Sequence, residues 1–179
     1  MWADSKTPLL VAAGDIKVEA VIELLFQGAM VNVLDVMHRN ALHLAIIASR
    51  AESTLIADML SSHSIDFSAC DVGNMTPLHY AVGTGSRQII DLLLKTGADI
   101  NMGIERKHWT ITTESGRPIY KECQVSEAAK KKINDAVGLT PLHFAACIGL
   151  NAMAEYLLSK GANLNACCHN GDTLLHIAL

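Results

Sequence analysis

The sequence predicts an all-α solenoid of stacked helix–turn–helix units, with projecting hairpin loops and one long inserted loop. Three observations lead to this prediction. First, a phrase of the type T-P-L-H-x-A recurs along the chain. Second, the number of residues from Thr7 to Asn40 equals the number from Thr140 to Thr173. Third, a glycine follows three copies of the phrase at one constant distance along the chain. Self-similarity at a fixed period of about 20 to 50 residues is the sequence signature of repeat architectures.

The recurring phrase marks the start of each expected unit. A Thr or Asn side chain at its first position can accept hydrogen bonds from free backbone N–H groups, and the proline that follows in three copies suits a first helical turn. Its fourth position is His in all copies except the first, which has Leu10. The five copies are Thr7–Ala12, Asn40–Ala45, Thr76–Ala81, Thr140–Ala145 and Thr173–Ala178.

The unit that begins at Thr76 predicts two helices. Leu78 and Val82 recur at helical spacing in the first of them. The apolar run at 89–94 supplies the buried side of the second helix, and Gly97 is the kind of residue that follows a helix C-terminus. Two other copies are followed by a glycine, Gly28 or Gly161, at the same distance along the chain as Gly97 from Thr76.

The phrase, its period of about 33 residues and the closing glycine resemble the ankyrin-repeat family. The resemblance implies a single ankyrin-repeat domain over residues 1–179. It covers the whole chain except an insertion at about 103–133. The implied repeats are approximately 6–38, 39–74, 75–138 and 139–171, with a partial fifth at 172–179.

Two departures from the family pattern lead to further expectations. The longer interval from Asn40 to Thr76 places three extra residues near Ser49–Glu52, so the second helix of that repeat is expected to be tilted or less regular. The sequence ends inside the first helix of a fifth unit, which has no polar outer face. Terminal repeats normally need such a face, so we expect the natural protein to continue beyond Leu179.

The insertion concentrates positive charge. It holds seven of the 14 Lys and Arg residues and four of the 18 Asp and Glu residues, a balance of +3 against −7 for the rest. Short strands are expected at 109–113 and 118–120, and a helix at 126–133. The insertion either contacts a partner, with Trp109 and Tyr120 as anchors, or is a tolerated surface loop. Its lysines at 130–132 fit a solvated helix face better than a nucleic-acid or nuclear-import signal.

The repeated histidines are predicted to be structural. His43, His79, His143 and His176 lie whole repeats apart, so stacking would separate them by about 10 Å, too far to share a metal ion. The ankyrin resemblance implies that each one bonds backbone groups between neighbouring repeats.

No residue pattern predicts catalysis, a metal ion or a cofactor. The best metal-like cluster, Cys167-Cys168-His169, is expected to be a loop thiol pair, since adjacent cysteines rarely both bind one zinc ion. Nucleophile, phosphate-loop and zinc-protease motifs do not occur. The sequence therefore predicts no enzyme.

The resemblance places a partner at the loop tips and the concave face of the inner helices. Several of these positions are apolar, which marks an interaction site unless the side chains pack between neighbouring tips. The predicted partner-binding residues are Val36, Met37, Arg39, Val72, Met75, Val137, Leu139, Ile148, His169, Asn170 and Asp172, with Trp109 and Tyr120 from the insertion.

The function expected from these features is that of a non-catalytic protein–protein interaction scaffold. The partner would be a protein or peptide segment, and the chain a monomer. Net charge is −4, so no nucleic acid is expected, and no apolar run predicts membrane insertion. The expected location is cytoplasmic or nuclear, since no signal peptide is seen. The alternative is a targeting arm of an enzyme or secreted effector whose catalytic domain lies outside this chain.

Overall fold

The chain folds into short helices that group in pairs. The structure is a computed structural model, and it describes residues 6–73, 75–103, 138–168, 171 and 173. Within these residues there are eight helices, and an isolated antiparallel bridge pairs Cys167 with Thr173. The prediction of an all-α repeat fold is therefore confirmed. The chain divides into two compact units, Met1–Ala98 and Asp99–Leu179.

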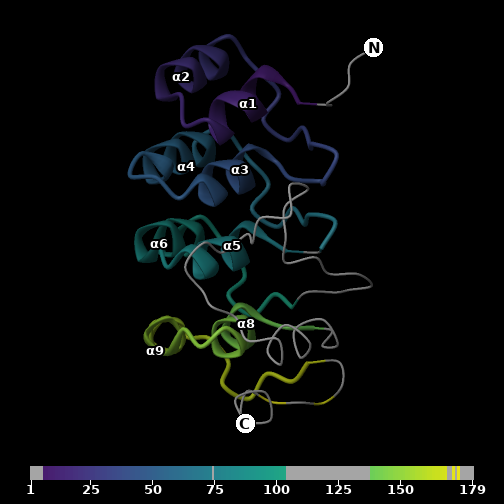
Figure 1. The fold of residues 1–179 in the computed structure, drawn as a ribbon, viewed down its shortest axis with the longest axis vertical. Helices are drawn as coiled ribbons and strands as arrows, with labels where there is room; N and C mark the ends of the chain where they lie inside the picture. The colour runs from purple at the N-terminus through teal and green to yellow at the C-terminus, as the bar shows by residue number, and fades with distance from the viewer. Residues whose placement is uncertain (1–5, 74, 104–137, 169–170, 172, 174–179) are drawn as a thin grey trace. The chain divides into compact units, whose positions relative to one another are not determined.

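The N-terminal unit contains three helix pairs in two layers. The first helices of the pairs, α1, α3 and α5, pack on one another in order, and the second helices α2, α4 and α6 form the other layer (Figure 1). The loops between pairs extend past the first helices. The six helices are α1 (Pro8–Gly14), α2 (Val18–Phe26), α3 (Ala41–Ala48), α4 (Ser53–Ser61), α5 (Pro77–Thr84) and α6 (Arg87–Lys95).

The C-terminal unit contains one helix pair within its described residues. Helix α8 (Pro141–Cys147) packs against α9 (Asn151–Ser159). The N–H of Asn163, after α9, donates a hydrogen bond of 2.8 Å to Oδ1 of Asn101. The insertion and the partial fifth repeat lie outside the described residues, apart from Gly103 and Thr173.

The helices begin where the repeated phrase predicts. Thr7, Asn40 and Thr140 each cap a helix, and their side-chain oxygens accept the N–H three residues on at 3.4, 3.1 and 3.4 Å. Proline occupies the start of α1, α5 and α8, where its missing N–H costs no helical hydrogen bond. Helices of seven to nine residues are too short to be stable alone, so packing must hold them.

The core is built from small and branched apolar side chains. Leu42 and Ile46 of α3 and Ile56 and Leu60 of α4 have no exposed surface. Each such side chain contributes about 1.5–3 kcal/mol when it leaves water. The two layers are therefore held together mainly by apolar burial.

The second repeat accommodates its extra residues without distorting its helices. Ser53, the first residue of α4, lies further along the chain from Asn40, the cap of α3, than Val18, the first residue of α2, lies from Thr7, the cap of α1. The extra residues lie in the loops before and after α4. Helix α4 has nine residues, like α2, α6 and α9. Helix α4 is therefore as long and as continuous as the other second helices, because the loops absorb the length difference; the expected irregularity is wrong, and the expected tilt stays a prediction.

A left-handed residue follows the second helix of every described repeat. In three repeats it is a glycine, Gly28, Gly97 or Gly161, with φ of 77°, 102° and 93°. In the second repeat Ser64 takes the same place, with φ of 57°. A side chain in this region costs about 1–2 kcal/mol, which glycine avoids.

Replacing Ser64 by glycine should therefore stabilise the protein. We expect the free energy of unfolding to rise by about 1 kcal/mol, since glycine's own entropy cost offsets part of the relieved strain. Urea unfolding measures the change. The matched control is Ser62→Gly, because Ser62 has a right-handed φ of −73° and should lose stability. An equal or lower stability for Ser64→Gly would contradict the argument.

Candidate functional site

A short loop precedes the first helix of the second repeat, α3, and another precedes the first helix of the third repeat, α5. We name the segments Asp35–Arg39 and Asp71–Met75 the tip loops; Asn74 of the second one lies outside the described residues. Each aspartate stands at the same distance before the cap of the helix that follows, Asn40 or Thr76. Both aspartates are buried, at 3% and 7% exposure.

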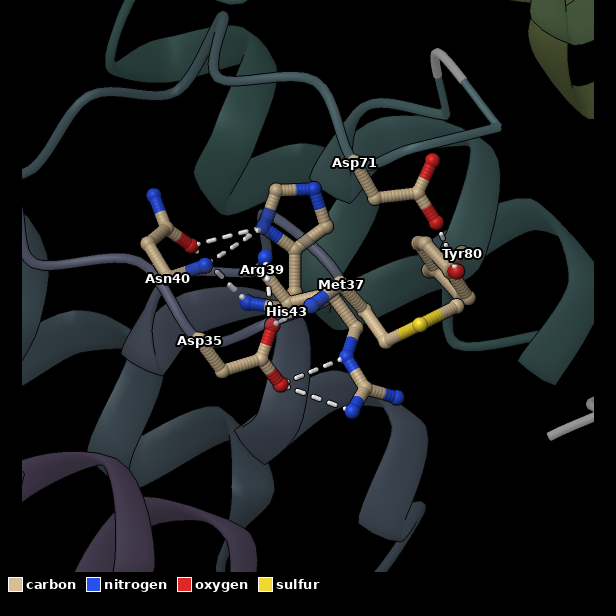
Figure 2. A network of polar contacts seen from close by, with 7 residues as sticks. All are labelled: Asp35, Met37, Arg39, Asn40, His43, Asp71 and Tyr80. Atoms are coloured by element: carbon tan, nitrogen blue, oxygen red, sulfur yellow. Dashed lines mark hydrogen bonds and ion pairs between the residues drawn. The ribbon is translucent and has the colours of Figure 1, made fainter. Parts of the chain in front are cut away.

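Asp35 closes the first tip loop. Its N–H donates to the carbonyl of Arg39 at 2.9 Å, and its Oδ1 accepts the N–H groups of Met37 and Arg39, both at 2.9 Å. Its Oδ2 accepts Nε and Nη2 of Arg39 at 2.9 and 2.7 Å (Figure 2). One carboxylate thus holds both ends of the loop.

Asp71 closes the second tip loop in the same way, with one change. Its N–H donates to the carbonyl of Met75 at 3.1 Å, and its Oδ1 accepts the N–H groups of Gly73 and Met75 at 2.8 Å. The residue equivalent to Arg39 is Met75, whose side chain carries no hydrogen-bond donor. The Tyr80 hydroxyl, from α5, donates to Oδ2 instead (Figure 2).

The two tip loops are joined to each other. The N–H of Val72 donates to the carbonyl of Met37 at 2.9 Å. The ring of His43 lies edge-on to that of Tyr80, with centroids 5.6 Å apart, and its Nε2 donates to the carbonyl of Met75 at 3.1 Å. The backbone of one repeat is thereby fixed to the next at the base of both loops.

The pKa values of His43, Asp35 and Tyr80 depend on burial and on the neighbouring groups just described. Burial lowers the pKa of His43 to about 4, so the ring is neutral at neutral pH. Burial tends to raise the pKa of Asp35, but the hydrogen bonds and charge of Arg39 outweigh it and the pKa is lowered. Burial and the neighbouring Asp71 raise the pKa of Tyr80, so its hydroxyl stays a donor.

The structure places four of the predicted binding residues on the tip loops with exposed or half-buried side chains. Val36 and Val72 are 52% and 47% exposed, and Met37 is half-buried. Arg39 keeps 15% of its side-chain surface exposed, because its guanidinium binds Asp35 of the same loop. Val36 and Val72 thus present apolar surface, whereas Arg39 mainly holds the loop.

Met75 and Leu139 do not present apolar surface, which corrects the expectation that they form part of an open edge. They are 3% and 0% exposed. Each stands just before a helix cap, where an apolar residue typically packs onto the fourth residue of the helix. Those residues are Tyr80 and Phe144, and both are buried as well.

The remaining predicted binding residues are placed only in part. Ile148, directly after α8, is half-buried. The others lie outside the described residues: Trp109, Tyr120, Val137, His169, Asn170 and Asp172.

The repeated histidines within the described residues are buried at the start of their helices. Nδ1 of His43 accepts the N–H of Asn40 at 3.3 Å, and His79 and His143 bind Thr76 and Thr140 in the same way at 3.4 Å. Burial lowers the pKa of His143, while the Ala166 backbone opposes the shift. His176 lies outside the described residues.

The described thiols and acidic groups do not gather into a site for chemistry. Cys167 is exposed, Cys168 is buried, and both are free thiols. Within the described part of the chain, no three His, Cys, Asp or Glu side chains lie close enough to hold a metal ion. None of the described helices has the length and apolar character to cross a lipid bilayer.

Asp35, Asp71 and Tyr80 were not identified from the sequence, although one signal was present. An aspartate stands at the same distance before the cap in three repeats, at Asp35, Asp71 and Asp135. Since aspartate side chains readily accept backbone N–H groups two residues on, this regular spacing indicates a held turn. Tyr80 gave no such signal, because the family phrase leaves its fifth position open.

Comparisons with known proteins agree with this architecture. The family model described as ankyrin repeats (3 copies) matches residues 9–104 and 113–179. The chain is 30% identical over 183 residues to the human transient receptor potential cation channel subfamily A member 1. It is 31% identical over 175 residues to the mouse B-cell lymphoma 3 protein homolog, and 29% identical over 167 residues to mouse Rabankyrin-5.

The similarity extends along this chain but not along the relatives. The matches cover 98%, 97% and 90% of this chain, against 16%, 32% and 14% of the channel, the lymphoma protein homolog and Rabankyrin-5. The chain therefore spans less than a third of the length of these three relatives.

Proposed function

Because this chain belongs to the ankyrin-repeat family, whose members generally act by binding other proteins, we propose that it is a non-catalytic interaction scaffold. Its binding surface would consist of the tip loops and the exposed face of the inner helices. The partner would be an apolar or amphipathic segment of another protein.

One observation carries this proposal. The two tip loops are held by buried aspartates and joined by the Val72–Met37 hydrogen bond, yet their valines remain about half exposed. A loop that is ordered before binding loses little conformational freedom when a partner arrives. Burial of each valine can then contribute about 1.5–3 kcal/mol to binding.

Further residues are proposed to extend the binding surface. Ile148 follows an inner helix, and His169, Asn170 and Asp172 precede the fifth copy of the phrase, as the tip loops precede theirs. Val137 stands before the fourth copy. Trp109 and Tyr120 of the insertion are proposed as aromatic anchors, with acidic groups of the partner near the basic insertion.

The finer properties of the whole protein belong to the same proposal. We infer a monomer that binds no nucleic acid, which the net charge of −4 supports. The chain has five cysteines, an odd number with no regular disulfide framework, which favours the cytoplasm or nucleus, where cysteines stay reduced. Absence of catalysis is proposed for the chain as a whole on the ground that the repeat family is an interaction module.

A second candidate function is that of a targeting arm. The chain matches less than a third of the channel and the two other relatives, so its repeats could position a further domain. In that case the tip loops would select where an enzymatic or effector domain acts.

The proposed binding surface is tested by comparing three baits. Wild-type protein, the double variant Val36→Asp with Val72→Asp, and the control Leu55→Asp are each used to capture proteins from cells. Leu55 lies on α4 and is 51% exposed, so it matches the valines in exposure but not in location. A partner of the tip loops should be retained by wild type and Leu55→Asp and lost from the double variant.

Affinity for each such partner should then fall at least about tenfold in the double variant, because charged side chains replace apolar contacts. Melting temperatures should agree among the three proteins, since all three positions are exposed. Partners that bind the double variant as tightly as the wild type would place the binding surface elsewhere.

A further inference from the structure

The outer face of α2 is apolar where the other repeats are polar. Ile22 and Phe26 of α2 are 51% and 83% exposed, and Met30, in the segment that follows the helix, is 78% exposed. Counting from the left-handed residue of each repeat gives the equivalent positions. Those of Ile22 are Asp58, Asp91 and Glu155; those of Phe26 are Ser62, Lys95 and Ser159; and those of Met30 are Asp66, Asp99 and Asn163.

Stacking of another repeat would not cover these side chains. The second repeat lies between the first and third repeats of the N-terminal unit, and its Asp58, Ser62 and Asp66 are nevertheless exposed. A neighbouring repeat covers other positions of the second helix. Ile56 and Leu60 have no exposed surface, whereas their equivalents Ala20 and Leu24 at the start of the array are only half-buried.

The charges beside the apolar side chains are acidic. Glu19 lies one turn before Ile22, and Glu23 lies one turn before Phe26, so these side chains share a helix face. Both glutamates are exposed, and Val18–Phe26 contains no basic residue. Lys17, which precedes the helix, lies 3.3 Å from Asp15. A second copy of the chain would bring like charges together, so the acidic rim disfavours self-association on this face.

We propose that the outer face of α2, at Ile22 and Phe26, together with Met30 in the segment that follows the helix, is a second docking surface that binds an amphipathic helix bordered by lysine or arginine. Such a helix offers apolar anchors at positions i, i+3, i+4 and i+7, which suits an exposed apolar helix face. Its basic border would pair with Glu19 and Glu23. This surface is separate from the tip loops, so the chain could hold two partners.

The test uses a labelled amphipathic peptide of about 18 residues, with leucines on one face and lysines beside them. A matched peptide carries glutamates in place of the lysines. Fluorescence anisotropy with the full chain should show at least about tenfold tighter binding of the lysine peptide. The variant Ile22→Asp with Phe26→Ser, which gives α2 the residues of α4, should weaken that binding at least about tenfold.

Three further proteins sharpen the test. Glu19→Lys with Glu23→Lys keeps the apolar residues and should reverse the preference between the two peptides. Leu55→Asp and the tip-loop double variant should bind the lysine peptide like the wild type. Equal binding by the wild type and the Ile22/Phe26 variant would overturn the proposal. So would sedimentation that shows wild-type self-association lost in that variant, since a second copy would then be the occupant.

Discussion

Replacement of Arg39 by methionine, the residue at the equivalent place in the next repeat, should lower the free energy of unfolding by about 3 kcal/mol. The variant leaves the Asp35 side chain, which has no exposed surface, without its two hydrogen bonds to the guanidinium. Loss of one partner from a buried ion pair typically costs about 3–5 kcal/mol, and the two backbone N–H groups that remain on Asp35 reduce the loss. Urea unfolding measures it.

The matched control is Lys17→Met. Lys17 and Asp15 also form an ion pair, but their side chains are 63% and 55% exposed, so the change should stay within about 0.5 kcal/mol. Adding Leu44→Tyr to Arg39→Met should recover part of the loss, because Leu44 is equivalent to Tyr80 and a hydroxyl there can donate to the carboxylate. Equal losses in the two single variants would show that the Asp35–Arg39 pair does not hold the loop.

The protein should also lose stability as the pH falls from about 7 to about 4. His43 has a folded-state pKa of about 4, below its ordinary value of 6.5. Between these values the unfolded chain binds a proton that the folded chain does not, so a lower pH favours unfolding. One fully linked proton changes the free energy of unfolding by about 1.4 kcal/mol for each pH unit.

The variant His43→Leu tests the assignment, since the first repeat has the buried Leu10 at that place. It should be less stable at pH 7, because the bond to the Met75 carbonyl is lost, but its stability should fall less steeply between pH 6.5 and 4. Some slope remains, because burial lowers the pKa of His143 as well. The lowered pKa of Asp35 acts at a lower pH, below the ordinary carboxyl value of 3.8. An unchanged slope would exclude His43 as the source.

The helices could be predicted from the sequence because their signals are local. Thr7, Asn40, Thr76 and Thr140 cap the helices that the repeated phrase predicted, and the glycines behind them adopt the left-handed backbone expected past a helix end. Ser64 does the same without being glycine. The left-handed backbone of Ser64 follows from its place in the repeat, and it could not be predicted from the residue type alone.

The candidate site could be predicted only in outline, because exposure depends on contacts across repeats. Val36 and Met75 both precede a helix cap and both are apolar, yet one is half exposed and the other buried. They differ in their distance from the cap: Met75 is next to it, where an apolar side chain packs onto the helix, whereas Val36 stands further away. The side-chain partner of Asp35 is Arg39 and that of Asp71 is Tyr80, and these two partners stand at different positions in the repeat. The pairing of Asp71 with Tyr80 could therefore be recognised only from the structure.

The aspartate-held tip loops have a consequence for how the surface can change over time. The bonds that shape them come from backbone groups and from Asp35, Asp71, Arg39 and Tyr80. The side chains of Val36 and Val72 take no part in these bonds. In the proposed scaffold, substitutions at these two positions would therefore alter which partner is recognised while the fold keeps its stability, so binding specificity and folding would diverge independently.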